Sequence, residues 1–109
     1  MGTMFYGTSE QAIEVDDALL EHVQKVTLTK LRRGESFSMS WKDDDGRRET
    51  VWVHAALMLR FAIEEESGRL DGDLLRHLMD SANSNRGMDL SDGFVEQRRR
   101  AAQPTLRAA

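Results

Sequence analysis

Residues 36–54 read SFSMSWKDDDGRRETVWVH, and their pattern is the clearest indication of the fold. In its first six residues serine alternates with large apolar side chains, which is the pattern of a strand with one buried face. Charged and turn-forming residues follow at 42–48, and valine then alternates with Trp52 up to residue 54. The two alternating segments and the polar turn between them predict a β-hairpin.

A third strand is predicted over residues 57–64. The composition of this segment favours a helix, but its large apolar residues, Leu57, Leu59, Phe61 and Ile63, occupy every second position. We follow the alternation and interpret the segment as a strand. Nearer the N-terminus, residues 3–6 and 11–15 are short β-leaning runs separated by a turn-rich tetrad, which indicates an opening hairpin.

Two further segments have the spacing of amphipathic helices. In residues 16–33 apolar side chains recur at three- and four-residue steps, aspartates stand at the start, and Gly34 follows two arginines at the end. Residues 71–82 carry a second apolar stripe. Residues 91–109 contain few large apolar groups and several arginines, so we expect a basic tail that is flexible or forms a frayed helix.

The resulting order, ββ-α-βββ-α, predicts an α+β fold of two layers, in which two helices cover one face of a single, largely antiparallel sheet. We expect one domain over residues 1–90, followed by the basic tail. The core would combine the helical stripes with the inward residues of the central strands, which are Phe37, Met39, Trp41, Val51, Val53, Leu59, Phe61 and Ile63. The uncovered face would show the intervening residues, which are Ser36, Ser38, Ser40, Thr50, Trp52, His54, Met58 and Arg60.

The composition is that of an ordinary globular domain. The chain has 109 residues, of which 39% are hydrophobic and 31% are charged, and its net charge is −4. It has no cysteine, so neither disulfides nor thiolate metal sites form. No segment reads as a signal peptide or approaches the roughly 18 apolar residues of a membrane span. We therefore expect a cytoplasmic protein that does not contact membranes.

The sequence lacks the motifs of common enzymes. Its three histidines, His22, His54 and His77, have no spacing that would define a metal site, and no Gly-x-Ser-x-Gly elbow surrounds a serine. No glycine-rich phosphate loop occurs, and the acidic run at 43–45 lacks the ligand spacing of a calcium loop. We expect a protein that is not an enzyme and needs no metal or cofactor.

The uncovered sheet face is the first candidate for function. There Trp52 stands beside His54 and Arg60, as on a surface where a base or a partner's side chain stacks, although a second copy or the N-terminal hairpin would also conceal it. We expect a non-catalytic interaction domain that forms a homo-oligomer or binds a protein partner. The candidate interaction residues are Trp52, His54, Arg60, Met58, Ser38, Ser40 and Thr50.

The alternative is a nucleic-acid-binding accessory protein of DNA metabolism or repair. Arg32 and Arg33 at the end of the first helix would converge with Arg47 and Arg48 of the hairpin turn to bind phosphates, and Trp52 would stack on a base. The net charge of −4 argues against broad electrostatic attachment to DNA.

The chain contains several distinctive short segments, which are residues 1–3 (MGT) with 6–7 (YG), 15–17 (VDD), 30–37 (KLRRGESF), 51–54 (VWVH) and 78–84 (LMDSANS). Together they resemble a family of short actinobacterial proteins of unknown function, over about residues 1–90. Some members of that family carry His-Pro where this chain has His54-Ala55, which suits a break between two strands.

Members of that family often carry the automatic label of ATP-dependent DNA ligase, and the residues of this chain do not support it. Such ligases use the lysine of a Lys-x-Asp-Gly motif as the adenylated nucleophile. The nearest segments here are residues 69–72 (RLDG), where arginine does not deprotonate to attack, and residues 42–46 (KDDDG), which has one residue too many.

Overall fold

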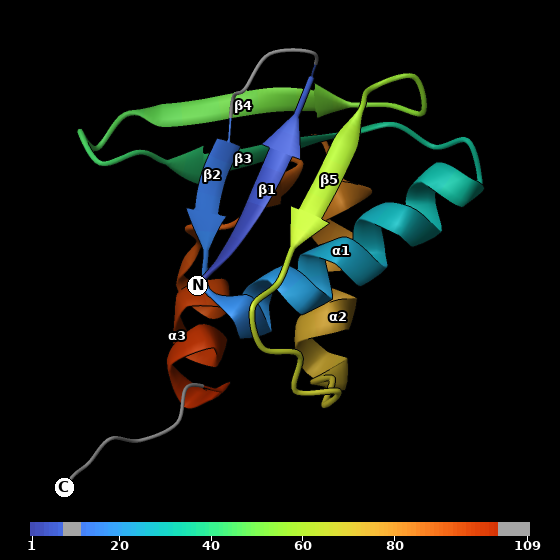
Figure 1. Cartoon of the computed structure of the whole chain (residues 1–109). Helices are drawn as coiled ribbons and strands as arrows, with labels where there is room; N and C mark the ends of the chain where they lie inside the picture. The colour runs from blue at the N-terminus through green and yellow to red at the C-terminus, as the bar shows by residue number, and fades with distance from the viewer. Residues whose placement is uncertain (8–11, 103–109) are drawn as a thin grey trace, which may run out of the picture.

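The computed structural model describes residues 1–7 and 12–102. Within these residues the chain forms six strands and three helices (Figure 1). Their bounds are β1 (Gly2–Tyr6), β2 (Ala12–Val15), α1 (Asp17–Arg32), β3 (Phe37–Lys42), β4 (Arg48–Val53), β5 (Leu59–Ala62), α2 (Gly72–Ala82), β6 (Met88–Asp89) and α3 (Gly93–Ala102). The structure confirms the predicted α+β class, both predicted helices and the strand within residues 57–64. It also confirms the antiparallel pairing of β3 with β4 and of β1 with β2.

The prediction of one sheet is wrong, because the strands divide into two sheets of three. In the first sheet the order is β2-β1-β5, and both pairs are antiparallel. In the second the order is β4-β3-β6, with β3 antiparallel to β4 and parallel to β6. The strand after the hairpin therefore leaves β4 and pairs with β1, where Phe61 lies opposite Met4 and Leu59 lies opposite Tyr6.

The division into two sheets places two apolar faces against one core. The rings of Tyr6 on β1 and Trp41 on β3 meet edge to face at 5.6 Å, so the sheets touch through their inner faces. Met4 and Met39 are fully buried between the elements. All eight strand residues predicted for the core lie on its side: Phe37, Met39, Trp41 and Val53 are buried, and Val51, Leu59, Phe61 and Ile63 are partly buried against it.

The three helices close the rest of the core. The side chain of Asp16 caps α1 by accepting from the backbone N–H of Leu19, and Asp71 caps α2 by accepting from Asp73 and Leu74. Each cap fixes where the apolar stripe behind it begins. In Figure 1 the helices lie below the β3–β4 hairpin, which crosses near the upper ends of β1 and β5.

The chain after residue 90 contributes to the core. Residues 93–102 form α3, whose Val95 is fully buried, and Arg98 donates to the carboxylates of Asp71 and Asp73 at 3.2 and 3.1 Å. The segment predicted as a basic tail thus includes a helix that packs on α1. The remaining part of that prediction, residues 103–109, lies outside the described residues. No helix among the described residues is long and apolar enough to cross a bilayer.

Candidate functional site

The outer face of the β4-β3-β6 sheet gathers four of the predicted interaction residues. The register places Ser38 opposite Trp52 and Ser40 opposite Thr50, and because side chains alternate across a strand, all four lie on the same face. Trp52 is 59% exposed there, which is unusual for so large an apolar side chain. This face, which we call the outer face, is defined by Ser38, Ser40, Thr50 and Trp52 together with Arg48 and Asp89.

Ser40 is on the predicted side but is not exposed. Only 1% of its surface is accessible, because Arg48 lies over it and donates to its hydroxyl at 3.2 Å. The Ser40 hydroxyl also bonds to that of Thr50 at 2.9 Å, and Arg48 continues to the carboxylate of Asp89 at 2.9 Å. Ser40 is therefore buried on the face where the sequence places it exposed, and its side chain ties the three strands together.

The carboxylate of Asp89 is the fixed end of this network. Burial raises the pKa of Asp89, but hydrogen bonds from the backbone and hydroxyl of Ser91, with the charge of Arg48, together lower that pKa below its ordinary value. An ionised Asp89 holds the Arg48 guanidinium across the sheet. Arg48 is therefore engaged within its own chain.

Three other predicted interaction residues lie away from the outer face. Arg60 is on β5, in the other sheet, where its guanidinium stacks 4.0 Å from the ring centre of Phe5. Met58 is 68% exposed in the connection before β5, and the ring of His54 accepts from the N–H of Ala56 within the same turn. The expected single face is thus split, because β5 pairs with β1 instead of β4.

The edge of β4 that faces away from β3 has no strand beside it within the described chain. The N–H of Asp43 donates to the carbonyl of Arg47 at 2.9 Å, so this pair bonds directly across the hairpin. Backbone groups of successive residues point to opposite sides of a strand. The N–H and C=O groups of Arg48, Thr50 and Trp52 therefore point away from β3.

The pairing on the far side of β3 agrees with this direction. The Ser40 carbonyl accepts from the N–H of Leu90 at 2.9 Å, beyond β6. The backbone groups of Ser40 therefore point away from β4. Those of its cross-strand partner Thr50 point away from β3. The free edge of β4 thus offers three N–H and three C=O groups.

A polar groove lies next to Trp52, where β3 begins. Its volume is about 530 Å³, and its wall includes Phe37, Ser38 and the turn after α2 at Asn83 and Asn85. Lys30 of α1 also lines it, although this side chain is only 3% exposed. The Lys30 ammonium donates to Glu35 at 3.1 Å and to the side-chain oxygen of Asn83.

Sequence reasoning missed that Lys30 is buried and that it pairs with Asn83. The signal for Lys30 was present, because it lies four residues after Val26 and seven after Val23 and so falls on the buried stripe of α1. A lysine in such a position needs a polar partner. That partner, Asn83, is 53 residues away, and nothing local indicates that the two meet.

The four arginines of the alternative hypothesis do not come together. Arg32 and Arg33 end α1 shortly before β3 starts, whereas Arg47 and Arg48 follow its far end, so the full length of β3 separates the two pairs (Figure 1). Arg47 is paired with Asp43 and Asp45, and Arg48 with Asp89. The structure thus contains two separate arginine pairs in place of the expected patch.

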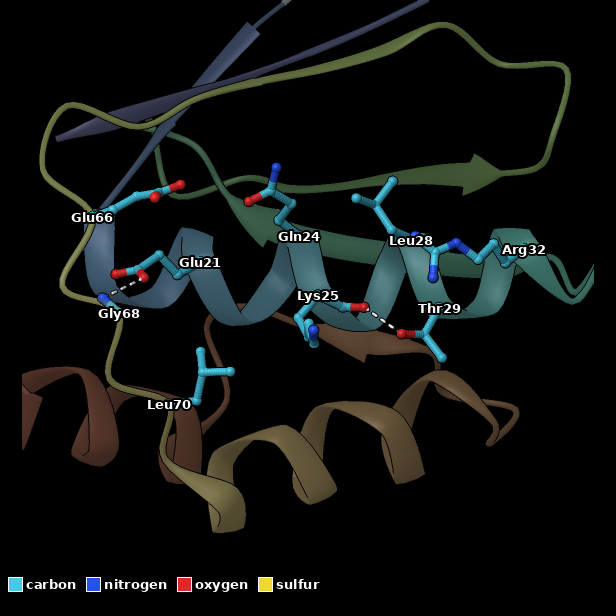
Figure 2. A pocket seen from close by; sticks show the side chains of 9 residues that line it. All are labelled: Glu21, Gln24, Lys25, Leu28, Thr29, Arg32, Glu66, Gly68 and Leu70. Atoms are coloured by element: carbon cyan, nitrogen blue, oxygen red, sulfur yellow. Dashed lines mark hydrogen bonds between the residues drawn. The ribbon is translucent and has the colours of Figure 1, made fainter.

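A second hollow, of about 290 Å³, lies between α1 and the segment at 63–71. The side chains that line it are shown in Figure 2. Its acidic residue Glu21 is engaged: the carboxylate accepts from the N–H of Ser67 at 3.0 Å, the Ser67 hydroxyl at 2.9 Å and the N–H of Gly68 at 3.3 Å. The carboxylate of Asp17 accepts from the backbone N–H groups of Glu64 and Glu65 in the same segment. The acids of α1 thus fasten an irregular connection to the helix.

The comparisons with known proteins identify the family without a function. The chain belongs to the family described as a domain of unknown function (DUF7882), whose model matches residues 1–93. No curated protein and no solved structure matches it. The match includes β6 and Asp89, so the network on the outer face lies within the family domain.

Proposed function

We propose that this member of the DUF7882 family is a non-catalytic interaction domain that self-associates, with the β4 edges of two copies pairing as antiparallel strands. The observation that carries the proposal is the edge of β4 that no described strand covers, where the backbone groups of Arg48, Thr50 and Trp52 point outward beside a 59% exposed indole. Addition of a strand to such an edge is a common mode of protein recognition.

The sequence of β4 is complementary to itself in one register. With a two-fold axis at Thr50, each outward-pointing residue faces another: Thr50 faces Thr50 of the second copy, and Arg48 faces Trp52 of the second copy. These three facing pairs form six hydrogen bonds between the chains. Each indole then packs on the aliphatic stem of the opposite Arg48, whose guanidinium Asp89 holds to the side. No like charges lie opposite each other.

A second copy is favoured over other occupants because the edge of β4 has no lysine, proline or bulge, and its two charged residues, Arg48 and Glu49, both lie at its first end. Natural edge strands are often protected by charged side chains, proline or a bulge that discourages pairing. β4 reads RETVWV and is rich in residues that favour strands, and all six residues pair with β3 in unbroken register. Pairing two copies would join the two β4-β3-β6 sheets into one sheet of six strands. Neither β4 edge would then remain free.

Sedimentation equilibrium of Thr50→Pro tests the proposal. Proline removes the outward N–H of Thr50 and leaves the bonds to β3 intact. Two interchain hydrogen bonds are lost in the dimer, so the dissociation constant should rise about 30-fold or more. Thr50→Val is the matched control, because it keeps the N–H and should associate like the wild type.

A wild-type chain that stays monomeric up to millimolar concentration would refute the proposal, and so would a Thr50→Pro variant that associates as tightly as Thr50→Val. Circular dichroism checks that both variants fold. If Thr50→Pro does not fold, Thr50→Lys replaces it, since two lysines facing each other at the axis repel, and the weakened association should recover as salt rises.

A further inference from the structure

The groove beside Trp52 has the wall of a ligand site. Its volume of about 530 Å³ lies within the range of roughly 300–1,000 Å³ that is typical of small-molecule pockets. It is formed by the end of α1, the starts of β3 and the 83–85 turn, and Trp52 near the end of β4. Four elements distant in sequence thus meet around one hollow.

The polar groups of the groove are arranged in advance. The Lys30 ammonium is held by both Glu35 and Asn83, which fixes a cation, a carboxylate and an amide at one end. Because Lys30 and Glu35 neutralise each other, the groove has no net charge to attract an ion. The side chains of Ser36, Ser38 and Asn85 add hydroxyls and an amide, which both donate and accept.

The remaining wall is the exposed indole of Trp52. An indole face is electron-rich and attracts polarised C–H bonds. A sugar ring presents such C–H bonds on its face and hydroxyls around its rim, and those hydroxyls also both donate and accept. We propose that this groove binds a saccharide, with the ring stacked on Trp52 and its hydroxyls bonded near Asn83, Asn85 and Ser38.

The groove shares one residue, Trp52, with the proposed self-association. The pairing of β4 uses backbone groups at the edge of the sheet and packs Arg48 of the second copy against the indole, whereas the groove lies toward β3 and α2 and uses side chains. The Thr50→Pro variant, which weakens the pairing and leaves the groove intact, should therefore bind a saccharide at least as tightly as the wild type does. Failure of either proposal leaves the other standing.

The test is a titration of the ¹⁵N-labelled full chain followed by NMR. The probes are glucose, galactose, N-acetylglucosamine and cellobiose, each at up to about 50 mM, well above a dissociation constant on the order of 1 mM. At least one probe should shift the Trp52 indole N–H and the backbone N–H groups of Ser38 and Asn83 in a saturable way. Sorbitol, which has the hydroxyls but no ring, should not.

Two variants locate the site. Trp52→Ala should weaken binding about tenfold by removing the stacking wall, and Asn85→Ala should weaken it roughly three- to tenfold by removing one hydrogen-bonding group. Met58→Ala removes another exposed apolar side chain, which lies outside the groove, and should bind as the wild type does.

Three outcomes would overturn the inference: no saturable shift with any of the four saccharides, equal shifts with sorbitol, or unchanged affinity in Trp52→Ala. Sodium acetate is added as a further arm. Saturable binding of acetate at Lys30 in place of the saccharides would show that the groove takes a carboxylate and would also overturn it.

Discussion

Gly87→Ala is expected to lower the free energy of unfolding by about 2–5 kcal/mol, as measured by urea denaturation. Gly87 has a φ of +77°, where a residue with a Cβ is strained by roughly 1–2 kcal/mol. A Cβ at this position would also overlap the hydroxyl of Ser38 and lie 2.7 Å from the Ser38 carbonyl oxygen, and such overpacking costs about 1–3 kcal/mol more.

The matched control separates the two causes. Gly34 follows the end of α1 and has a φ of +73°, but a Cβ there would meet no atom within 4 Å. Gly34→Ala should therefore lose only the backbone contribution, roughly 1–2 kcal/mol. Equal losses of stability in the two variants would contradict the close packing of Gly87 against Ser38 of β3.

Glu21→Gln is expected to lower the free energy of unfolding at pH 7 by about 2–3 kcal/mol, because the amide has one neutral acceptor oxygen in place of two charged ones and its NH2 group cannot accept from the donor on the other side. Glu21 is 9% exposed and accepts three hydrogen bonds from Ser67 and Gly68. Glu66 lines the same hollow but is exposed, so Glu66→Gln should change stability by less than about 0.5 kcal/mol.

The loss in Glu21→Gln should also depend on pH. Burial raises the pKa of Glu21, but the bonds from Ser67 and Gly68, with the nearby His22, outweigh it and leave the pKa below its ordinary value. The stability that the ionised carboxylate contributes is thus complete above about pH 4.3 and disappears as the pH falls through the lowered pKa. Denaturation at pH 7 and pH 3 should show the variant approaching the wild type at the lower pH; a constant difference would contradict this role of Glu21.

The elements of this fold could be predicted from the sequence because their signals are local. The alternation of serine with apolar residues at 36–41 and the apolar stripe of α1 are both patterns among residues close in sequence. The structure has a strand and a helix at these positions. The division into two sheets could not be predicted. The division depends on the pairing of β5 with Met4 and Tyr6 of β1, more than 50 residues earlier in the chain. No local pattern distinguishes β1 from β4 as the partner of β5.

The candidate site was predictable to the same limited extent. Alternation correctly places Trp52, Thr50 and Ser38 on one face, but it cannot show that Arg48 covers Ser40, because that requires Asp89 on a two-residue strand. Nor can a sequence reveal which strand ends a sheet. The free edge of β4 and the meeting of Lys30 with Asn83 are products of the tertiary structure alone.

Amide hydrogen exchange as a function of protein concentration tests the self-association most directly, because it observes the edge of β4 residue by residue. In dilute solution the N–H groups of Thr50 and Trp52 should exchange freely, while that of Val51, which points to β3, is protected. As concentration rises, Thr50 and Trp52 should slow roughly tenfold and Val51 should stay protected throughout. Exchange at Thr50 and Trp52 that remains fast at every concentration, with Val51 protected, would contradict the pairing of β4 between two copies.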